Sequence, residues 1–290
     1  MRVVILNYFG QEDVVECLKS LETHIKIKTD VVVWNNGGAT DLISDHAKKL
    51  LNPDINIFVV PSKSNVGFAP GVNRACEWKP ERDFEALLLL NSDATLLTRL
   101  DEAKFQELLA LKSVVGFKVY NNAQKTERQK SARSFPSLIT SFTSRQSFVA
   151  KIFPNNPWTK KYLNLDLSEN TPQKVDWVSG CALFTSHVVW KKLGAFDEAY
   201  FFSVEDVDLG RTAQKKSVPV LYYPGIEVLH VGGVAAGRSA WKSDFYHHLG
   251  MWVYFIKWAR PLEFLVCPFV FAGILFRFLF RRVYQVKTGF

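Results

Sequence analysis

Cysteine is scarce in this sequence of 290 residues, and no apolar run is long enough to cross a membrane comfortably. Four scattered cysteines without a CxxC pair or metal-ligand spacing are typical of a reducing compartment, so we expect no structural disulfide. The opening segment MRVVILNYFGQEDVV lacks the apolar core and small-residue cleavage site of a signal peptide. We therefore expect a cytoplasmic location. The four cysteines are Cys17, Cys76, Cys181 and Cys267.

Several short catalytic motifs are also missing. The chain contains no G-x-G-x-x-G, no G-x-x-x-x-G-K-[ST], no H-E-x-x-H and no G-x-S-x-G string. Dinucleotide-binding, P-loop, zincin and hydrolase-elbow interpretations therefore lose their main support. A phosphate-bearing ligand held through a metal ion stays compatible with the sequence.

The composition is that of a globular protein with a basic end. Apolar residues make up 48% and charged residues 22%, which excludes disordered and fibrous classes. The formal net charge is +8, and the segment from Lys257 onward carries six basic residues against one acidic residue, Glu263. Basic charge concentrated at one end indicates a polyanionic partner, either a membrane surface or a nucleic acid.

Apolar runs alternate with helical periods over the first 120 residues. Cys17, Leu18 and Leu21 continue a helical spacing that follows an apolar run at Val3–Leu6. Continuous hydrophobicity in such runs predicts a parallel α/β sheet that is covered on both faces. The later expected strand and helix pairs are Val31–Trp34 with Leu42–Leu51, Ile55–Val60 with Pro70–Trp78, and Leu87–Leu90 with Asp101–Lys112, followed by a strand at Val114–Val119.

The second half of the chain carries weaker patterns. Between Asn121 and Gln173, Ser, Thr, Lys, Asn and Pro dominate, and we expect only a helix around Leu138–Phe153. An ordered segment, Val175–Phe184, follows. The remaining expected elements are a helix near His187–Leu193, a helix from about Glu205, strands at Val218–Tyr222 and Ile226–Val231, and an aromatic helix at Trp241–Trp258.

Polar residues and glycines follow each of the first four expected strands. Because ligands bind outside the carboxyl ends of parallel strands, these residues are candidates for a binding site, although turn chemistry alone also explains such loops. Asp93 ends the most hydrophobic strand, and one carboxylate there suits Mg²⁺ or Mn²⁺ with substrate phosphates as further ligands. Asp93 as a helix N-cap has less support, because Thr98 and Asp101 already form a capping sequence.

Three carboxylates, Glu205, Asp206 and Asp208, lie within four positions. Ser203 and Asp206 form a capping-box sequence, which explains one of them without function. Clustered carboxylates repel one another, which suits one of them to general-base work in a cleft. Both interpretations stay open.

His230 follows the last apolar strand and precedes Gly232 and Gly233, a hinge-like stretch ending at Arg238. A lone histidine there is more often a structural residue. Together with Asp93 it would complete a mixed oxygen and nitrogen set that tolerates Mn²⁺ better than Mg²⁺.

These residues, in this order, resemble the family-two glycosyltransferases of fold type A, and within them the bacterial rhamnosyltransferase-like branch. The most specific string is N-V-G-F-A-P-G-V-N at 65–73, and the match covers roughly Val3 to Gly233. Asn35 stands where the family usually has a base-reading aspartate, and an amide oxygen can still accept a hydrogen bond from a pyrimidine N3–H. The resemblance implies a Rossmann-like, mostly parallel sheet flanked by helices.

The resemblance also implies a role for each matched residue. Asp206 corresponds to the catalytic base, and Asp93 with His230 corresponds to the protein ligands of a divalent cation, Mn²⁺ or Mg²⁺. The implied donor-binding residues are Asn7, Asn35, Asn65, Gly67, Asn73, Asn91 and Ser92. The implied acceptor-binding or sugar-binding residues are Trp177, Ser179, Gly180 and Glu205.

The implied reaction is transfer of a sugar, L-rhamnose from dTDP-rhamnose, to a hydroxyl of a lipid-linked or polysaccharide acceptor in cell-surface glycan synthesis of the O-antigen or capsule type. One base opposite the leaving group makes a single displacement, hence inversion. UDP-hexose or UDP-galactofuranose transfer would use the same framework. The rivals are an inactive sugar-nucleotide-binding scaffold and a nucleotidyltransferase. A nucleotidyltransferase usually has a glycine-rich cationic loop after its first strand, and this sequence lacks such a loop there.

The expected organisation is a catalytic domain at 1–238, with a nucleotide-sugar-binding half at 1–120 and an acceptor half at 174–238, followed by a helical tail at 239–290. Aromatic and basic residues mingle in the tail, which favours peripheral docking on the inner face of the cytoplasmic membrane, near a polyprenyl-diphosphate-linked acceptor. Its thirteen-residue uncharged run, Phe264–Phe276, is short for a spanning helix. A buried helix pair or a homodimer interface is the alternative, and nucleic-acid binding is not expected.

Overall fold

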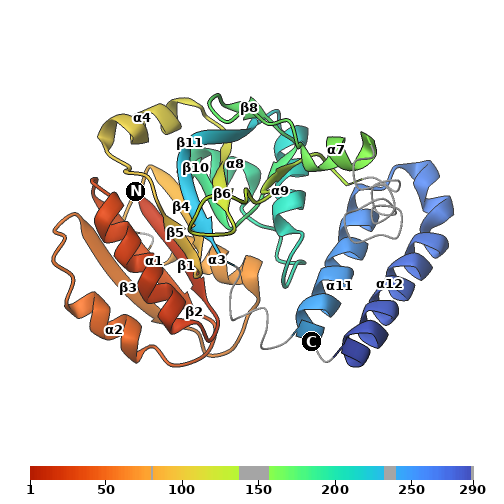
Figure 1. Ribbon diagram of the computed structural model, residues 1–290, viewed down its shortest axis with the longest axis horizontal. Helices are drawn as coiled ribbons and strands as arrows, with labels where there is room; N and C mark the ends of the chain where they lie inside the picture. The colour runs from red at the N-terminus through yellow and green to blue at the C-terminus, as the bar shows by residue number, and fades with distance from the viewer. Residues whose placement is uncertain (80, 137–156, 232–239, 289–290) are drawn as a thin grey trace.

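A single central β-sheet with helices on both faces forms the body of the protein in the computed structural model (Figure 1). The structure describes residues 1–79, 81–136, 157–231 and 240–288. The strand order is β3-β2-β1-β4-β10-β6-β11-β5, and β8 pairs with β11. The helix expected around Leu138–Phe153 and the stretch from Gly232 to Arg238 lie outside the described residues.

The first half follows the predicted alternation of strand and helix. Strands β3, β2, β1 and β4 are parallel neighbours, and Val3 pairs with Val31 on one side and Leu88 on the other. The elements are β1 (Arg2–Asn7), α1 (Gln11–His24), β2 (Thr29–Asn35), α2 (Asp41–Lys48), β3 (Ile55–Pro61), α3 (Phe68–Glu77) and β4 (Ala86–Asn91).

The second half adds antiparallel strands and the remaining helices. The elements are β5 (Ala94–Leu96), α4 (Glu102–Ala110), β6 (Val114–Tyr120), β7 (Ala132–Arg133), α7 (Pro157–Leu163), β8 (Gln173–Lys174), β9 (Trp177–Val178), β10 (Ala182–Ser186), α8 (His187–Leu193), α9 (Glu205–Lys215), β11 (Val220–His230), α11 (Ala240–Trp258), η1 (Pro261–Val266) and α12 (Cys267–Thr288).

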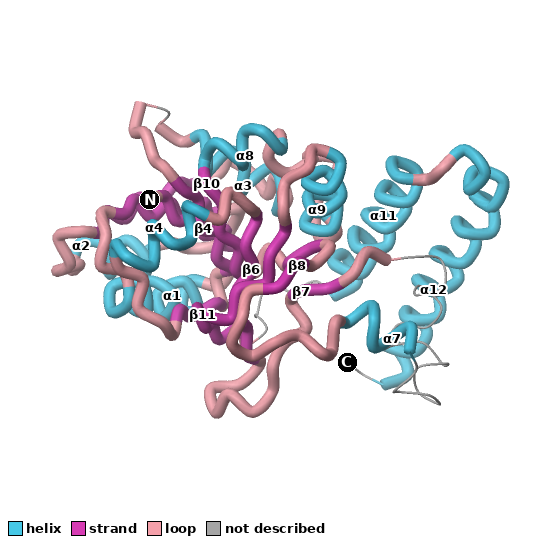
Figure 2. Tube along the Cα trace, turned by 90° about the horizontal axis from the view of Figure 1, so that it is seen from above, coloured by secondary structure: helices cyan, strands magenta, loops and turns pink. Residues whose placement is uncertain are grey.

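Two hydrophobic cores lie on opposite faces of the sheet. Successive side chains of a strand point to opposite faces, so Val3 and Ile5 pack into one core and Val4 into the other. Helices α1, α2 and α4 cover the first face, and α3, α8 and α9 cover the second (Figure 2). This double coverage explains the continuous hydrophobicity of the central strands.

The structure details one segment that the sequence described only as ordered, and corrects one expectation about strands. The segment Val175–Phe184 divides into the short strand β9 and strand β10, and β10 lies antiparallel between β4 and β6. The two strands expected at 218–231 are one strand, β11, whose register shifts between Tyr223 and Glu227. An irregularity interrupts the apolar pattern there without ending the strand.

Both capping predictions were wrong. Asp101 is itself the N-cap of α4, where its side chain accepts a hydrogen bond from the Lys104 N–H. Thr98 Oγ1 instead accepts from the Glu227 N–H. At α9 the N-cap is Val204, with no side-chain cap, and Ser203 faces another helix.

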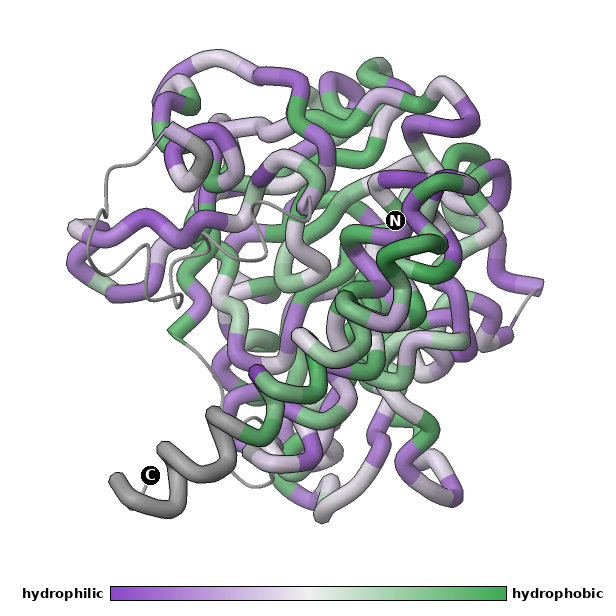
Figure 3. The backbone as a smooth tube through the Cα atoms, turned by 90° about the vertical axis from the view of Figure 1, so that its right-hand side faces the viewer, coloured by the Kyte–Doolittle hydropathy of each residue, from purple (hydrophilic) through white to green (hydrophobic). Residues whose placement is uncertain are grey.

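The C-terminal helices form an antiparallel hairpin at one end of the molecule, with α11 against the body and α12 outside it (Figure 1). The stretch Pro261–Leu279 is long and apolar enough to cross a membrane by length and composition, with a mean hydropathy of 2.0 and none of it buried. That stretch is longer than the thirteen-residue run seen in the sequence. In Figure 3 the coloured part of α12, which lies before the grey turns at the C-terminus, is largely hydrophobic.

Candidate active site

Sheet pairing brings Asp93 and His230 together. Asp93 lies in the tight turn between β4 and β5, and β5 pairs antiparallel with the end of β11, where Ala94 is opposite His230. Asp93 Oδ1 is 3.2 Å from His230 Nε2, and both side chains are largely buried. The structure thus joins two residues that the sequence linked only through their chemistry.

Asn91, the last residue of β4, completes this cluster. Its Nδ2 lies 3.2 Å from His230 Nε2. Its Oδ1 is buried and accepts no hydrogen bond from any residue that the structure describes. A buried amide oxygen without a partner is costly, so the cluster has an acceptor that a ligand would satisfy. Ser92, also expected at the donor site, lies in the turn after it.

Gln129 orients the imidazole of His230, a contact that sequence reasoning missed. Gln129 Oε1 lies 3.0 Å from His230 Nδ1. An amide oxygen only accepts, so Nδ1 carries a proton, and Nε2 is the nitrogen that faces Asp93 Oδ1 and Asn91 Nδ2. When the imidazole is neutral, Asp93 Oδ1 and His230 Nε2 are close enough to ligate one cation together.

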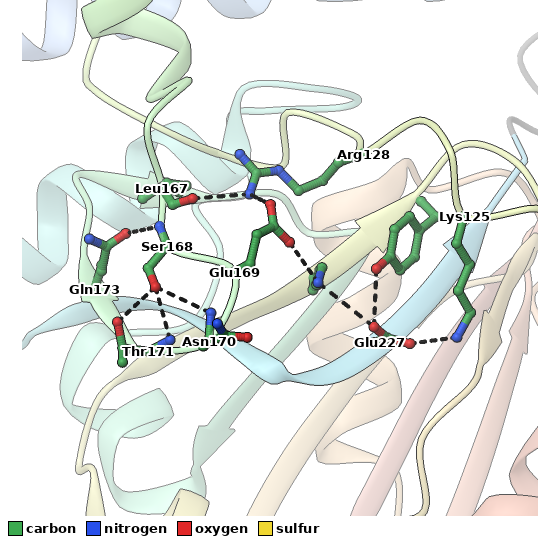
Figure 4. A network of polar contacts seen from close by, with 11 residues as sticks. Lys125, Arg128, Leu167, Ser168, Glu169, Asn170, Thr171, Gln173 and Glu227 are labelled. Atoms are coloured by element: carbon green, nitrogen blue, oxygen red, sulfur yellow. Dashed lines mark hydrogen bonds and ion pairs between the residues drawn. The ribbon is translucent and has the colours of Figure 1, made fainter.

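A polar network fixes the loop that carries Gln129 (Figure 4). Arg128 Nη1 is 2.6 Å from Glu169 Oε1, and Lys125 Nζ is 2.5 Å from Glu227 Oε2. Lys118 lies between these pairs, 2.6 Å from the other Glu169 oxygen. Because Glu227 and His230 share β11, the network ties the Gln129 loop to the strand that presents His230.

Three asparagines organise the loops after β1 and β2. Asn7 is fully buried, and its Nδ2 donates to Asn35 Oδ1 at 2.7 Å. Asn35 Nδ2 donates to the Gly38 carbonyl at 3.0 Å. Asn36, the next residue of the same loop, donates from Nδ2 to the Gly67 carbonyl at 2.8 Å. The Asn35 oxygen keeps a second lone pair, so its contact with a base stays a prediction.

The loop before α3 requires glycine at position 67. Gly67 has φ +96°, and a Cβ there would lie 2.6 Å from the Phe201 carbonyl oxygen. Asn65 Oδ1 accepts from the Gly67 N–H at 2.9 Å and closes the turn. The Phe68 N–H donates to the Phe201 carbonyl, so the loop rests against the aromatic run before α9.

Asn73 makes structural contacts with both ends of its amide. Its Nδ2 donates to the Phe196 carbonyl at 2.8 Å, and its Oδ1 accepts from the Phe196 N–H at 3.1 Å. It thereby joins α3 to the segment between α8 and α9. Donor binding by Asn65, Gly67 and Asn73 stays a prediction.

Asp206 lies in the first turn of α9, with its carboxylate held by two backbone groups. Oδ2 accepts from the Gly180 N–H at 3.1 Å, and Oδ1 accepts from the Val207 N–H at 2.8 Å. Burial raises the pKa of Asp206, and these two N–H groups oppose that rise. A raised pKa suits a general base, and Asp208 points away from this site into contacts with α11.

Glu205 is buried, with 6% of its surface exposed. Its Oε2 has no hydrogen-bond partner among the residues that the structure describes. Burial first, and then the charge of Asp206, raise the pKa of Glu205 well above its usual value. Simultaneous ionisation of Glu205 and Asp206 is therefore unfavourable.

Of the residues Trp177, Ser179 and Gly180, the last contacts Asp206 directly. Trp177 is buried and donates from Nε1 to the Ser134 carbonyl at 2.9 Å. The Ser179 N–H donates to the Ser131 carbonyl at 2.7 Å, which places the next residue, Gly180, against Asp206. The structure brings these residues together, and contact with a sugar stays a prediction.

The residues near Asp93 fit a divalent cation that takes only a few protein ligands. No group of three or more His, Cys, Asp and Glu side chains suited to a metal occurs in the described part of the chain. A carboxylate, an imidazole nitrogen and an unsatisfied amide oxygen leave room for phosphate ligands, as hard cations at diphosphate sites prefer.

Comparison with known families decides the class of protein. The sequence model of Glycosyl transferase family 2 matches residues 2–176, more than half of the chain. The chain belongs to this family. This confirms the resemblance, and glycosyl transfer is the activity of the class.

Two curated relatives are N-acetylglucosaminyl-diphospho-decaprenol L-rhamnosyltransferases from two strains of Mycobacterium tuberculosis, the CDC 1551 / Oshkosh and the ATCC 25618 / H37Rv strains. Each is 33% identical over 138 residues, which is 46% of this chain. The chain spans 44% of the length of these relatives.

Solved structures confirm a glycosyltransferase fold of type A. The mannosyltransferase PcManGT from Pyrobaculum calidifontis, in complex with GDP-Man and Mn²⁺, is similar with a TM-score of 0.56, at 15% identity over 94% of this chain and 72% of that one. S. aureus TarS 1-349 with UDP-GlcNAc has a TM-score of 0.54, at 15% identity over 94% of this chain and 71% of that one.

Proposed function

We propose that this glycosyltransferase moves L-rhamnose from dTDP-rhamnose, with inversion, to a hydroxyl of a polyprenyl-diphosphate-linked glycan in O-antigen-like or capsule-like synthesis. The observation that carries the proposal is the joint placement of Asp93, His230 and Asn91 at the carboxyl edge of the sheet. Asp206 supplies the second half of the site.

The Asp93 cluster would hold the donor diphosphate through Mn²⁺ or Mg²⁺. A bound divalent cation offsets the charge that builds on the departing nucleoside diphosphate. Asp93 and His230 would hold it, and the contact of Gln129 with Nδ1 leaves Nε2 as the nitrogen of His230 that faces Asp93. The PcManGT complex contains GDP-Man and Mn²⁺, and the TarS 1-349 complex contains UDP-GlcNAc, which agrees with this role.

Asp206 would act on the acceptor. Its carboxylate takes the proton of the acceptor hydroxyl while the oxygen forms a bond to C1 and the bond from C1 to the nucleoside diphosphate breaks. One base and one displacement give inversion. The N–H groups of Gly180 and Val207 fix the carboxylate without using all of its lone pairs.

The choice of sugar and acceptor rests on the curated relatives. Their names specify rhamnose and an N-acetylglucosaminyl-diphospho-decaprenol, and the shared 138 residues are 46% of this chain. We infer a lipid-linked acceptor of the same chemical class here. The test distinguishes this proposal from two alternatives. One is transfer from a UDP-hexose or UDP-galactofuranose donor, and the other is an inactive scaffold.

Calorimetric titration of the full chain tests the donor. The panel contains dTDP-rhamnose and the UDP-hexoses, first with Mn²⁺ and then with EDTA. We expect binding of dTDP-rhamnose that EDTA abolishes. If only a UDP-sugar binds, that UDP-sugar is the donor in place of dTDP-rhamnose. If no sugar nucleotide binds, an inactive scaffold is favoured.

Two variants separate the metal site from the base. Asp93→Ala should weaken both donor binding and transfer. Asp206→Asn should abolish transfer to N-acetylglucosaminyl-diphospho-decaprenol while donor binding persists. Asp45→Asn, at an exposed ion pair on α2, is the matched control. Near-normal transfer by Asp206→Asn would overturn the base assignment.

We also propose that the C-terminal hairpin docks on the cytoplasmic face of the membrane. Large apolar side chains on η1 and α12 are exposed, among them Leu265 at 76% and Phe269 at 77%. The sequence from Lys257 onward adds a charge of +5, which anionic lipids would attract. A homodimer through this face is the competing outcome.

Flotation with anionic vesicles tests the docking. Phe269→Glu should move the full chain from the vesicle fraction to the soluble fraction. Val188→Glu, at an equally exposed apolar residue on α8, should change nothing. If both variants float like the parent chain, or if Phe269→Glu converts a dimer to a monomer without affecting flotation, the docking proposal is wrong.

A further inference from the structure

The backbone just before the Glu205–Asp206 pair is strained. Ser203 and Val204 have φ of 70° and 76°, two consecutive non-glycine residues in the left-handed region. Val204 is β-branched, and such residues rarely adopt this conformation. A conformation of this kind persists only where surrounding contacts impose it, and it recurs at functional sites.

Helix α11 supplies those contacts. His247 Nδ1 lies 2.9 Å from Ser203 Oγ. Gly250, one turn further along, lets the helix approach so closely that a Cβ there would lie 3.0 Å from the Ser203 carbonyl oxygen and 3.2 Å from Val204 Cγ2. The Tyr246 ring stacks on Phe201, with 4.2 Å between ring centroids.

Further along the helices, α9 and α11 are joined by polar contacts. Lys257 Nζ contacts Asp208 at 2.8 Å and Asp197 at 2.6 Å. Arg211 Nε donates to Tyr254 OH at 2.8 Å. These contacts fix α11 relative to α9, so the face around Gly250 stays against the strained segment.

We propose that α11 is a positioning element of the active site: by holding Ser203 and Val204 in the left-handed conformation, it sets the place of the Asp206 carboxylate. The inference rests on the proposed role of Asp206 as catalytic base. His247 and Gly250 are positioning residues, because their effect on Asp206 passes through Ser203 and Val204.

Substitution at Gly250 tests the idea with a matched control in the same hairpin. Gly250→Ala forces Ser203 and Val204 to move by a few tenths of an ångström, whereas Gly273→Ala on α12 meets no atom within 4 Å. Small misplacement of a reacting group costs rate, up to about 100-fold per ångström. We expect Gly250→Ala to lower kcat about tenfold, with donor KM and donor Kd unchanged.

The larger substitutions Gly250→Val and Gly273→Val should differ from each other in kcat by more than the two alanine variants do. His247→Ala should also lower kcat, and His247→Asn should restore most of the loss because its amide can reach Ser203 Oγ. A kcat for folded Gly250→Ala within twofold of Gly273→Ala would overturn the proposal, as would equal rates for His247→Ala and the parent chain.

A measurement without substrate keeps the inference separate from the proposed function. The Gly180 N–H donates to Asp206 Oδ2, so its NMR shift and hydrogen-exchange rate report the place of the carboxylate. We expect both to change in Gly250→Ala and His247→Ala but not in Gly273→Ala. If no donor supports transfer, the proposed function fails, and an unchanged Gly180 signal would then independently overturn the positioning role.

Discussion

Asp208 anchors the junction between α9 and α11, and its removal should destabilise the protein by about 3 kcal/mol. Only 3% of Asp208 is exposed. Its Oδ1 accepts from Trp258 Nε1 at 2.7 Å and from Tyr200 OH at 3.1 Å. Tyr200 is fully buried, so Asp208→Ala leaves its hydroxyl without an acceptor, at roughly 1–3 kcal/mol.

The remaining partners of Asp208 contribute less. Loss of the hydrogen bond from Trp258 adds about 1 kcal/mol. Lys257 keeps its contact with Asp197, and its side chain is 35% exposed, so water compensates much of its lost ion pair. For a chain of this size, with about 2.1 cal/mol/K of unfolding entropy per residue, about 3 kcal/mol corresponds to a decrease in Tm of roughly 5 °C.

Thermal unfolding followed by circular dichroism, with urea titration for the free energy, measures this effect. Asp45→Ala removes a carboxylate from an ion pair whose partners are 60% and 76% exposed, and should change stability by less than about 0.5 kcal/mol. The reasoning is refuted if Asp208→Ala loses less than about 1 kcal/mol or behaves like Asp45→Ala.

Three further predictions concern the loops and acids of the site. Gly67→Ala, which combines positive φ with a contact of 2.6 Å, should cost at least about 2 kcal/mol, whereas Gly194→Ala, with φ +91° and open space, should cost about 1 kcal/mol in urea titration. Glu205→Gln should exceed the parent chain in stability at pH 8, because the raised pKa of Glu205 means that ionisation opposes folding; the gap should close as pH falls toward 4.5, and a constant gap would contradict this. Since burial raises the pKa of Asp206 and the base must be deprotonated, kcat/KM should fall on the acid side at a higher pH than for an exposed aspartate; a profile flat down to pH 4 would exclude this.

The first half of the fold could be predicted because its signals are local. Apolar runs such as Leu87–Leu90 and the helical period after Val14 depend on neighbouring residues only. The antiparallel insertion of β10 between β4 and β6 depends on pairing between distant segments, which no local pattern encodes. The same limit explains why β11 was divided in two at its irregular register.

The candidate site divides in the same way. The residues alone favoured Asp93 at the strand end, but they left the acids at 205–208 open between a helix cap and a base, and only the family resemblance singled out Asp206. Gln129 could not be found, because an isolated glutamine in a polar loop carries no signal until His230 lies against it. The contact of His247 with Ser203 joins residues 44 positions apart in segments of unrelated pattern.

The cysteine distribution also makes the C-terminal hairpin observable by chemistry. Burial raises the pKa of the Cys181 thiol to about 12 and also raises those of Cys17 and Cys76, so these three are poorly reactive. Cys267, at the start of α12, is partly exposed. A polarity-sensitive maleimide dye should therefore label the unmodified chain at one place, and its emission would report the surroundings of the hairpin without any engineered residue.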